Sequence, residues 1–261
     1  MKNQEILFGR GTKETYEALL KELEDSKNKK VVQPEKNNST STKDFSISDN
    51  DTFWTLNGVS HRNRSHQVNL LKSLLEDGES KTQDEWIKFA KSAMKNKEFY
   101  TPSLDLVYSI IRTAYLNKDN QKYQNEILQV KDFLKTSATN NYLITTTRLK
   151  YQPQGKDKII HNYKLSNQYE IQENIVGSDD CILQLQNVNK TLDALLGSDN
   201  PQEINNTFNW IFGVNTYLWR VNSTPKEEDE RVARFDAVSD RVYLNCDGDP
   251  TVSVSSLGVR A

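Results

Sequence analysis

The stretch that decides the fold is RVARFDAVSDRVYLNCDGDPTVSVSSLGVRA, residues 231–261. Apolar and polar residues alternate along VYLNCD, which predicts a β-strand with one buried and one exposed face. The residues expected inside are Val242, Leu244 and Cys246, and those expected outside are Tyr243, Asn245 and Asp247. Asp236, Val238 and Asp240 alternate on the other parity, so a bulge or loop near Arg241 must intervene if both sets are exposed.

The composition of this tail differs from that of the preceding chain. Lys, Glu, Gln, Met and Trp recur as far as Glu230 and are absent from residues 231–261, where about eight of them would be expected at the earlier rate. Strands disfavour Lys, Glu and Gln, which accounts for part of the shortfall. Strand propensity explains the complete absence of all five residue types less easily, so we look for a further cause.

Working outward from the tail, the chain shows helical periodicity. Residues 12–27 form an amphipathic pattern within an N-terminal helical segment (1–27), and the polar residues 28–51 predict a flexible linker. Within a domain expected over 52–261, the first part favours helices, which we predict over residues 65–76, from a capping box at 82–85, from Thr101 with Pro102 as first helical residue, and over 119–134.

After residue 137 the pattern changes. Residues 142–151 and 159–165 predict a β-hairpin around QPQGKD, and a further strand is expected over 169–175. Two short helices over 191–196 and 201–212 precede strands and loops from residue 214. Helices in the N-terminal half and a β-rich C-terminal tail predict an α+β fold.

Charge, hydropathy and cysteine content exclude several classes. Net charge is −2 and mean hydropathy −0.77. We therefore expect no nucleic-acid partner, and no apolar run suggests a membrane span. The start shows no signal peptide, so the expectation is a soluble chain, cytoplasmic by default. Cys181 and Cys246 form no framework and are read as ordinary thiols.

Metal and cofactor motifs are also weak. His61 and His66 are spaced wrongly for one helix face and His161 stands alone, so solvated or hydrogen-bonded histidines are expected. Asp240, Asp247 and Asp249 match no calcium-loop pattern. No phosphate-binding loop or nucleophile-elbow motif occurs, and we expect no metal, no cofactor and no catalytic residues.

Three short motifs of the C-terminal part resemble the formylglycine-generating-enzyme type of C-type lectin fold. Gly213 to Trp219 resembles that family's Gly-Asn-x-x-Glu-Trp segment, and Arg231-Val232-Ala233-Arg234 its Arg-Val-x-Arg. Pro250 followed by Leu257-Gly258-Val259-Arg260 resembles its closing Pro and Gly-Phe-Arg. FYTPSLDLVYSIIRTAY (99–115) matches the family's upstream helix more loosely. The resemblance implies a divergent member of this fold.

The departures from the family concern its chemistry. The Gly-Gly-Ser-Trp turn after Arg234 is missing, and so is the Glu of the first motif. The enzyme's two catalytic cysteines would fall at Ala237 and Val242. Without a cysteine pair its copper-thiolate chemistry has no ligands, so an enzyme is not expected.

The missing residue types connect this fold to a second resemblance. Diversity-generating retroelements randomise adenines in AAY codons of variable proteins with a C-type lectin fold. By the genetic code the resulting NNY codons exclude Lys, Glu, Gln, Met and Trp, the five types that the tail lacks. The chain resembles such a variable protein, most nearly the archaeal, nanoarchaeal kind, which implies massive sequence variation in a region of about 214–256.

That resemblance implies a ligand-binding surface with the physics of a paratope, on which Tyr supplies area and Asp, Ser and Asn hydrogen bonds. The partner implied is a macromolecule, a protein or cell-surface component. The candidate contact residues are Tyr217, Arg220, Asn222, Asp236, Val238, Asp240, Tyr243, Asn245, Asp247, Gly248, Thr251 and Val252. Arg234 and Arg260 are expected to hold the scaffold through buried hydrogen bonds, and Trp219 to lie in the core.

Two other readings stay open. An oxidoreductase of the formylglycine-generating type would need a metal or cysteine site. An adhesion module of the same fold would have a fixed ligand and a tail that is constant between related genomes.

Overall fold

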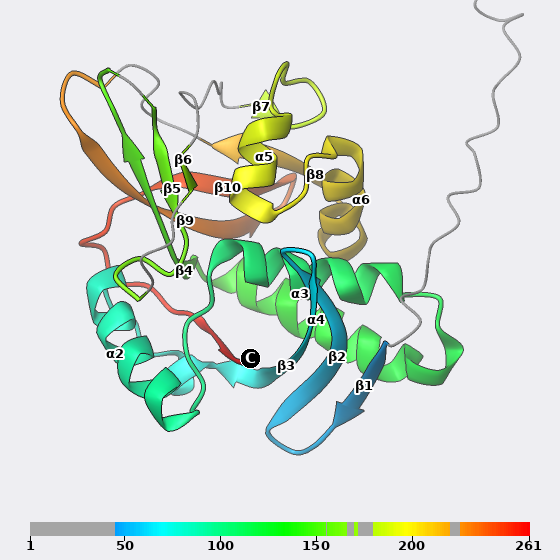
Figure 1. The fold of residues 1–261 in the computed structure, drawn as a ribbon. Coiled ribbons are helices and arrows are strands. Elements are labelled where there is room, and N and C mark those ends of the chain that lie inside the picture. Colours follow the sequence, from blue (N-terminus) through cyan, green and yellow to red (C-terminus); the bar gives the residue numbers. More distant parts are fainter. Residues whose placement is uncertain (1–44, 155, 166–169, 172–179, 220–224) are drawn as a thin grey trace, which may run out of the picture. The chain divides into compact units, whose positions relative to one another are not determined.

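In the computed structural model, residues 45–154, 156–165, 170–171, 180–219 and 225–261 are described, all within one unit, Thr40–Ala261 (Figure 1). The segment expected as an N-terminal helix and most of the expected linker lie outside these residues. The described residues form two β-sheets, of four and seven strands, together with helices (Figure 1).

The smaller sheet has the strand order β1-β2-β3-β11 and is antiparallel throughout. Its strands are β1 (Ser46–Asp49), β2 (Phe53–His61), β3 (Arg64–Leu74) and β11 (Leu257–Arg260). The β2–β3 hairpin turns through Arg62 and Asn63, both with positive φ, 46° and 63°. Two successive left-handed residues match the right-handed twist of the flanking strands.

Two sequence predictions are wrong in this sheet. The helix expected over 65–76 is strand β3, followed by a 3-10 turn, η1 (Leu75–Gly78). Its short apolar run fits either period, and pairing with β2 and β11 decides for the strand, burying Val68 and Leu70 completely. The linker prediction fails for β1, because Ile47 is buried and Ser46–Asp49 pairs with β2.

The larger sheet has the order β6-β5-β4-β9-β10-β8-β7. Its strands are β4 (Leu143–Tyr151), β5 (Lys158–Ile160), β6 (Glu170–Ile171), β7 (Asp180–Cys181), β8 (Asn215–Trp219), β9 (Asp229–Val238) and β10 (Arg241–Gly248). Among the strand pairs in the described residues of this sheet, β10–β8 is parallel and the others are antiparallel. The predicted β4–β5 hairpin and the tail strands are confirmed.

The helices are α2 (Gln83–Asn96), α3 (Leu104–Leu116), α4 (Gln124–Asn140), α5 (Asn189–Leu196) and α6 (Pro201–Phe212), with a 3-10 turn, η2 (Gln121–Tyr123), before α4. The capping box of α2 is confirmed: Thr82 and Glu85 exchange both bonds. α3 begins two residues later than predicted, because the Pro102 carbonyl accepts from Thr146 in β4. α4 continues beyond the predicted end at residue 134.

The core lies between the sheets. α3 and α4 contact strands of both sheets, and α6 packs on β8 and β10 (Figure 1). On the side of the larger sheet that points away from this core, Trp86 of α2 packs with Ile144, Val232 and Leu75. A mixed α and β architecture is thus confirmed, but strands β1–β3 in the N-terminal half contradict the helices-first order.

Candidate functional site

Strand register brings the tail together with β8 on the outer face of the larger sheet. Residues opposite each other in neighbouring strands point to the same side. The three rows across β9, β10 and β8 are Val238, Arg241 and Asn215; Asp236, Tyr243 and Tyr217; and Arg234, Asn245 and Trp219. We call these nine residues the outer face.

The residues between them point into the core. Val242, Leu244 and Cys246 of β10 are fully buried, as the alternation predicted. The change of parity between β9 and β10 comes from a tight turn at Ser239 and Asp240, which confirms the predicted loop near Arg241. Ala237 and Val242, where the related enzyme would carry its cysteines, are buried cross-strand partners without thiols.

An aromatic cluster forms the middle of the outer face. The Tyr243 ring meets Trp219 edge-on at 5.6 Å and Tyr217 at 6.3 Å between centroids. The Arg241 guanidinium lies 4.9 Å from the Tyr217 centroid and 6.0 Å from that of Tyr243. Edge-to-face rings and a cation over a ring each contribute about 0.5–1 kcal/mol. All four side chains are half-buried, so part of each is available to a partner.

Carboxylates flank this cluster. The Asp240 carboxylate accepts from Arg241 Nη2 at 2.5 Å, and this hydrogen bond lowers the pKa of Asp240. Burial raises the pKa of Asp236, although Arg234 and a hydrogen bond from Asn245 Nδ2 at 3.4 Å oppose the shift. Burial also raises the pKa of Asp247. The outer face therefore combines aromatic area with both signs of charge.

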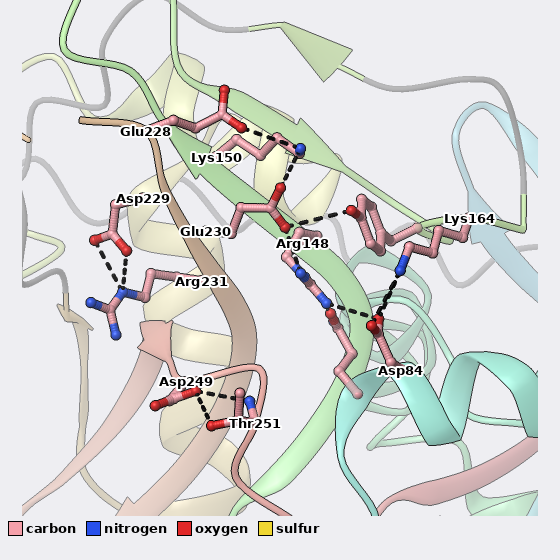
Figure 2. A network of polar contacts seen from close by, with 12 residues as sticks. Asp84, Arg148, Lys150, Lys164, Glu228, Asp229, Glu230, Arg231, Asp249 and Thr251 are labelled. Atoms are coloured by element: carbon pink, nitrogen blue, oxygen red, sulfur yellow. Dashed lines mark hydrogen bonds and ion pairs between the residues drawn. The ribbon is translucent and has the colours of Figure 1, made fainter.

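The start of β9 is held by a polar network that includes α2 (Figure 2). Arg148 of β4 is buried and donates from Nη1 to Glu230 at 2.6 Å and from Nη2 to Asp84 at 3.2 Å. Lys150 also pairs with Glu230, and although burial opposes it, these two cations hold the pKa of Glu230 below its ordinary value. Glu230, the last residue before the tail, is thus anchored to β4, and through Arg148 to Asp84 of α2.

Gln83, the first residue of α2, orients Arg148. Its Oε1 accepts from Arg148 Nε at 2.5 Å, and its Nε2 donates to the carbonyls of Thr145 and Thr147 at 2.8 and 3.1 Å. These carbonyls lie where β4 shifts register against β9. The fully buried Gln83 amide therefore satisfies an irregular strand and the arginine that holds the tail.

The predicted contact residues divide into three groups. Tyr217, Asp236, Val238, Tyr243 and Asn245 lie together on the outer face, with Asp240 in the adjoining turn. Asp247 lies beyond them on β10, and its carboxylate interacts with Trp219, whereas Thr251 and Val252 are exposed in the loop after β10. Arg220 and Asn222 lie outside the described residues.

Gly248 and Asn245 differ from their predicted roles. Gly248 is buried, and a Cβ there would stand 2.7 Å from the Val232 carbonyl oxygen, so close packing of β9 and β10 requires glycine. Asn245 faces outward but is only 8% exposed, and its side-chain amide bonds the Asp236 carboxylate and the backbone N–H of Asp247.

The three predicted scaffold residues are corrected as well. Trp219 is half-buried on the outer face rather than in the core, because β8 pairs in parallel with β10 and turns it to the Tyr243 side. The Arg234 guanidinium lies 4.9 Å from the Tyr142 ring, and its buried Nε has no hydrogen-bond partner in the described chain. Arg260 lies over Phe53 and Phe99, at 5.2 and 4.9 Å, instead of bonding a carboxylate.

Sequence reasoning missed Arg241, Asn215 and Tyr142. Arg241 lies two residues before Tyr243 in the same strand and therefore points to the same face. The alternation would have predicted this if the strand had been taken to begin at Arg241. Asn215 is identified only through the β8–β10 register, and Tyr142, which is 54% exposed, only through its contact with Arg234.

Two of the three histidines, His61 and His161, belong to a separate buried cluster around Asp105 of α3. Asp105 accepts from Ser103 at 2.5 Å and from Arg62 Nε at 2.6 Å, and its carboxylate lies 2.9 Å from His61 Nε2. Burial opposes ionisation, but the neighbouring histidines and the Ser103 hydroxyl lower the pKa of Asp105.

Both ring nitrogens of His161 lie within hydrogen-bond distance of polar groups. Nδ1 lies 2.9 Å from Thr147 Oγ1 and 3.3 Å from Asp105 Oδ1. Nε2 donates to the Ala194 carbonyl at 2.7 Å. Burial lowers the pKa of His161, although the Asp105 carboxylate and the Ala194 carbonyl oppose the shift. His61 and His161 are thus hydrogen-bonded, as predicted.

Comparisons with protein-family models, with curated proteins and with solved structures found no match. The described residues contain no group of three or more His, Cys, Asp or Glu side chains placed to hold a metal ion. Among the described helices none combines the length and the apolar character that crossing a membrane requires.

Proposed function

We propose that this chain is a ligand-binding protein, that the outer face of β8, β9 and β10 contacts a macromolecular partner, and that a retroelement diversifies the tail. In this proposal the fold is a divergent C-type lectin fold of the formylglycine-generating type. The observation that carries the binding role is the half-exposed cluster of Tyr217, Trp219, Tyr243 and Arg241.

The chemistry of this cluster suits a protein-sized partner. Trp, Tyr and Arg dominate the energetics of protein interfaces, because their large, rigid groups bury area at small entropy cost. The cluster spreads over three neighbouring strands of a sheet, which favours a contact surface of roughly 800 Å² on each side over a small metabolite.

Diversification is supported by the separation of roles within each strand. Val238, Asp240, Arg241 and Tyr243 belong to residue types that NNY codons encode, and none of these side chains is fully buried. Exchange at these positions leaves the buried residues between them untouched. Trp219 belongs to a type that NNY codons exclude, so within the region of about 214–256 it is a fixed position that gives the surface a constant part.

The neighbouring DNA tests diversification. We expect a near-copy of the tail's coding sequence that differs from it only where the copy has adenines, beside a reverse-transcriptase gene. A genome without this copy, or a tail that is constant between closely related genomes, refutes diversification and favours a fixed-ligand adhesion module.

Two matched display libraries test the binding role. One randomises Val238, Asp240, Arg241 and Tyr243 with NNY codons, and the other treats the inward Ala237, Val242, Leu244 and Cys246 in the same way. We expect most members of the first library to stay folded and to yield binders to a model protein such as serum albumin, because only surface side chains change. If the outer library unfolds as often as the inner one, or yields no binders, the outer face is not a recognition surface.

A further inference from the structure

A polar pocket lies apart from the outer face, among α3, the β2–β3 turn and the segment that joins α5 to α6. Its volume is about 470 Å³, within the range of small-molecule sites. Tyr108 and Arg112 come from α3, and Asn63 comes from the hairpin turn. Asp193 comes from α5, and Ser198 and Asp199 come from the segment that follows it. None of these residues belongs to the outer face.

The Tyr108 hydroxyl is the feature that points to a ligand. Tyr108 is only 1% exposed, and its Oη makes no hydrogen bond of standard geometry to a described residue, although the Thr207 and Ser198 side chains interact with it. Burial, aided by the Glu203 carboxylate, raises the pKa of Tyr108 to about 12, so the phenol stays protonated and able to donate. A buried hydroxyl without a partner costs about 1–3 kcal/mol, which a bound polar group would recover.

The charges around the pocket limit the class of ligand. The only hydrogen bond of the Arg112 guanidinium to a described residue runs from Nε to Glu203, which leaves its two Nη groups available. The carboxylates of Asp193 and Asp199 stand exposed at the rim. An anion without a positive group would be repelled by these carboxylates. A cation without a negative group would be repelled by Arg112. A molecule carrying both charges satisfies both sides.

We propose that this pocket binds a small zwitterion of the α-amino-acid type, with its carboxylate on Arg112 and the Tyr108 hydroxyl and its ammonium on Asp193 and Asp199. Aromatic and largely apolar molecules do not fit, because the lining is almost wholly polar. This pocket shares no residue with the outer face, so a negative result for one site leaves the other unaffected.

The test is a thermal-unfolding screen of the full chain against the twenty L-amino acids at 10 mM, about the concentration at which millimolar affinities register. We expect at least one to raise the melting temperature. Its amide, which lacks the carboxylate, and its 2-hydroxy acid, which lacks the ammonium, should each lose most of the shift. If no amino acid raises the melting temperature, or if either analogue matches the parent, the proposal is wrong.

Two tyrosine variants separate a ligand role from a structural one. Tyr108→Phe removes a hydroxyl that makes no hydrogen bond of standard geometry to a described residue, so the free protein should keep or raise its melting temperature while the amino-acid shift disappears. Tyr151→Phe is the control, since the Tyr151 hydroxyl donates to the Cys246 carbonyl at 2.7 Å. It should lower the melting temperature and retain the shift. A shift that persists in Tyr108→Phe overturns the assigned site.

Discussion

Replacing Gln83 by leucine should destabilise the protein far more than an exchange of similar shape elsewhere on a helix. The change keeps the volume of the side chain but removes all of its hydrogen bonds. The carbonyls of Thr145 and Thr147 and the Nε of Arg148 then lose their partner in a fully buried place. The prediction therefore tests whether the amide of Gln83 holds the irregular part of β4.

The magnitude follows from these three groups. Each buried polar group left without a partner costs about 1–3 kcal/mol, and the apolar surface of leucine returns about 2 kcal/mol. Local relaxation lets water reach some of the freed groups, so the lower part of the range applies. We expect a loss of about 3 kcal/mol in the free energy of unfolding, or roughly 6–12 °C in melting temperature for a domain of this size.

The measurement is urea unfolding followed by circular dichroism, with the free energy taken from the midpoint and slope. Gln124→Leu is the matched control, because Gln124 is also the first residue of its helix and is exposed. It should change the free energy by no more than about 0.5 kcal/mol. If the two variants differ by less than about 1 kcal/mol, the role assigned to Gln83 is refuted.

Two further predictions concern acid and the tail. Because burial lowers the pKa of His161 below 6.5, the unfolded state binds more protons, so stability is complete above pH 6.5 and falls as the pH drops below it. Melting temperatures measured from pH 7.5 to 5 should show this decline, and the decline should be smaller in His161→Gln. If the melting temperature of His161→Gln falls with pH as steeply as that of the parent protein, other groups cause the decline. Gly248→Ala should cost about 1–3 kcal/mol in urea unfolding, because the new Cβ meets the Val232 carbonyl. Val252→Ala, in the exposed loop, is its control, and equal midpoints for the two variants contradict the packing argument.

Local patterns were enough for several elements. The capping box at Thr82 marked the start of α2, Asn200 and Pro201 open α6, and the alternation in VYLNCD assigned the buried face of β10 correctly. These features depend on neighbours within a few residues, so the sequence carries them directly. The prediction of a helix over residues 65–76 was wrong because the apolar run there fits both helical and strand periodicity. Only pairing with β2 and β11 selects the strand β3.

The amino-acid sequence by itself determined which tail residues alternate between core and surface, and that five residue types are missing after Glu230. Only the tertiary structure decided what lies beside them. The parallel pairing of β8 with β10 turns Trp219 outward against Tyr243, and the hairpin between β9 and β10 brings Asp236 and Arg241 onto the same side. Register between strands distant in sequence depends on the packing of the whole core, and a shift by one residue would reverse every one of these faces.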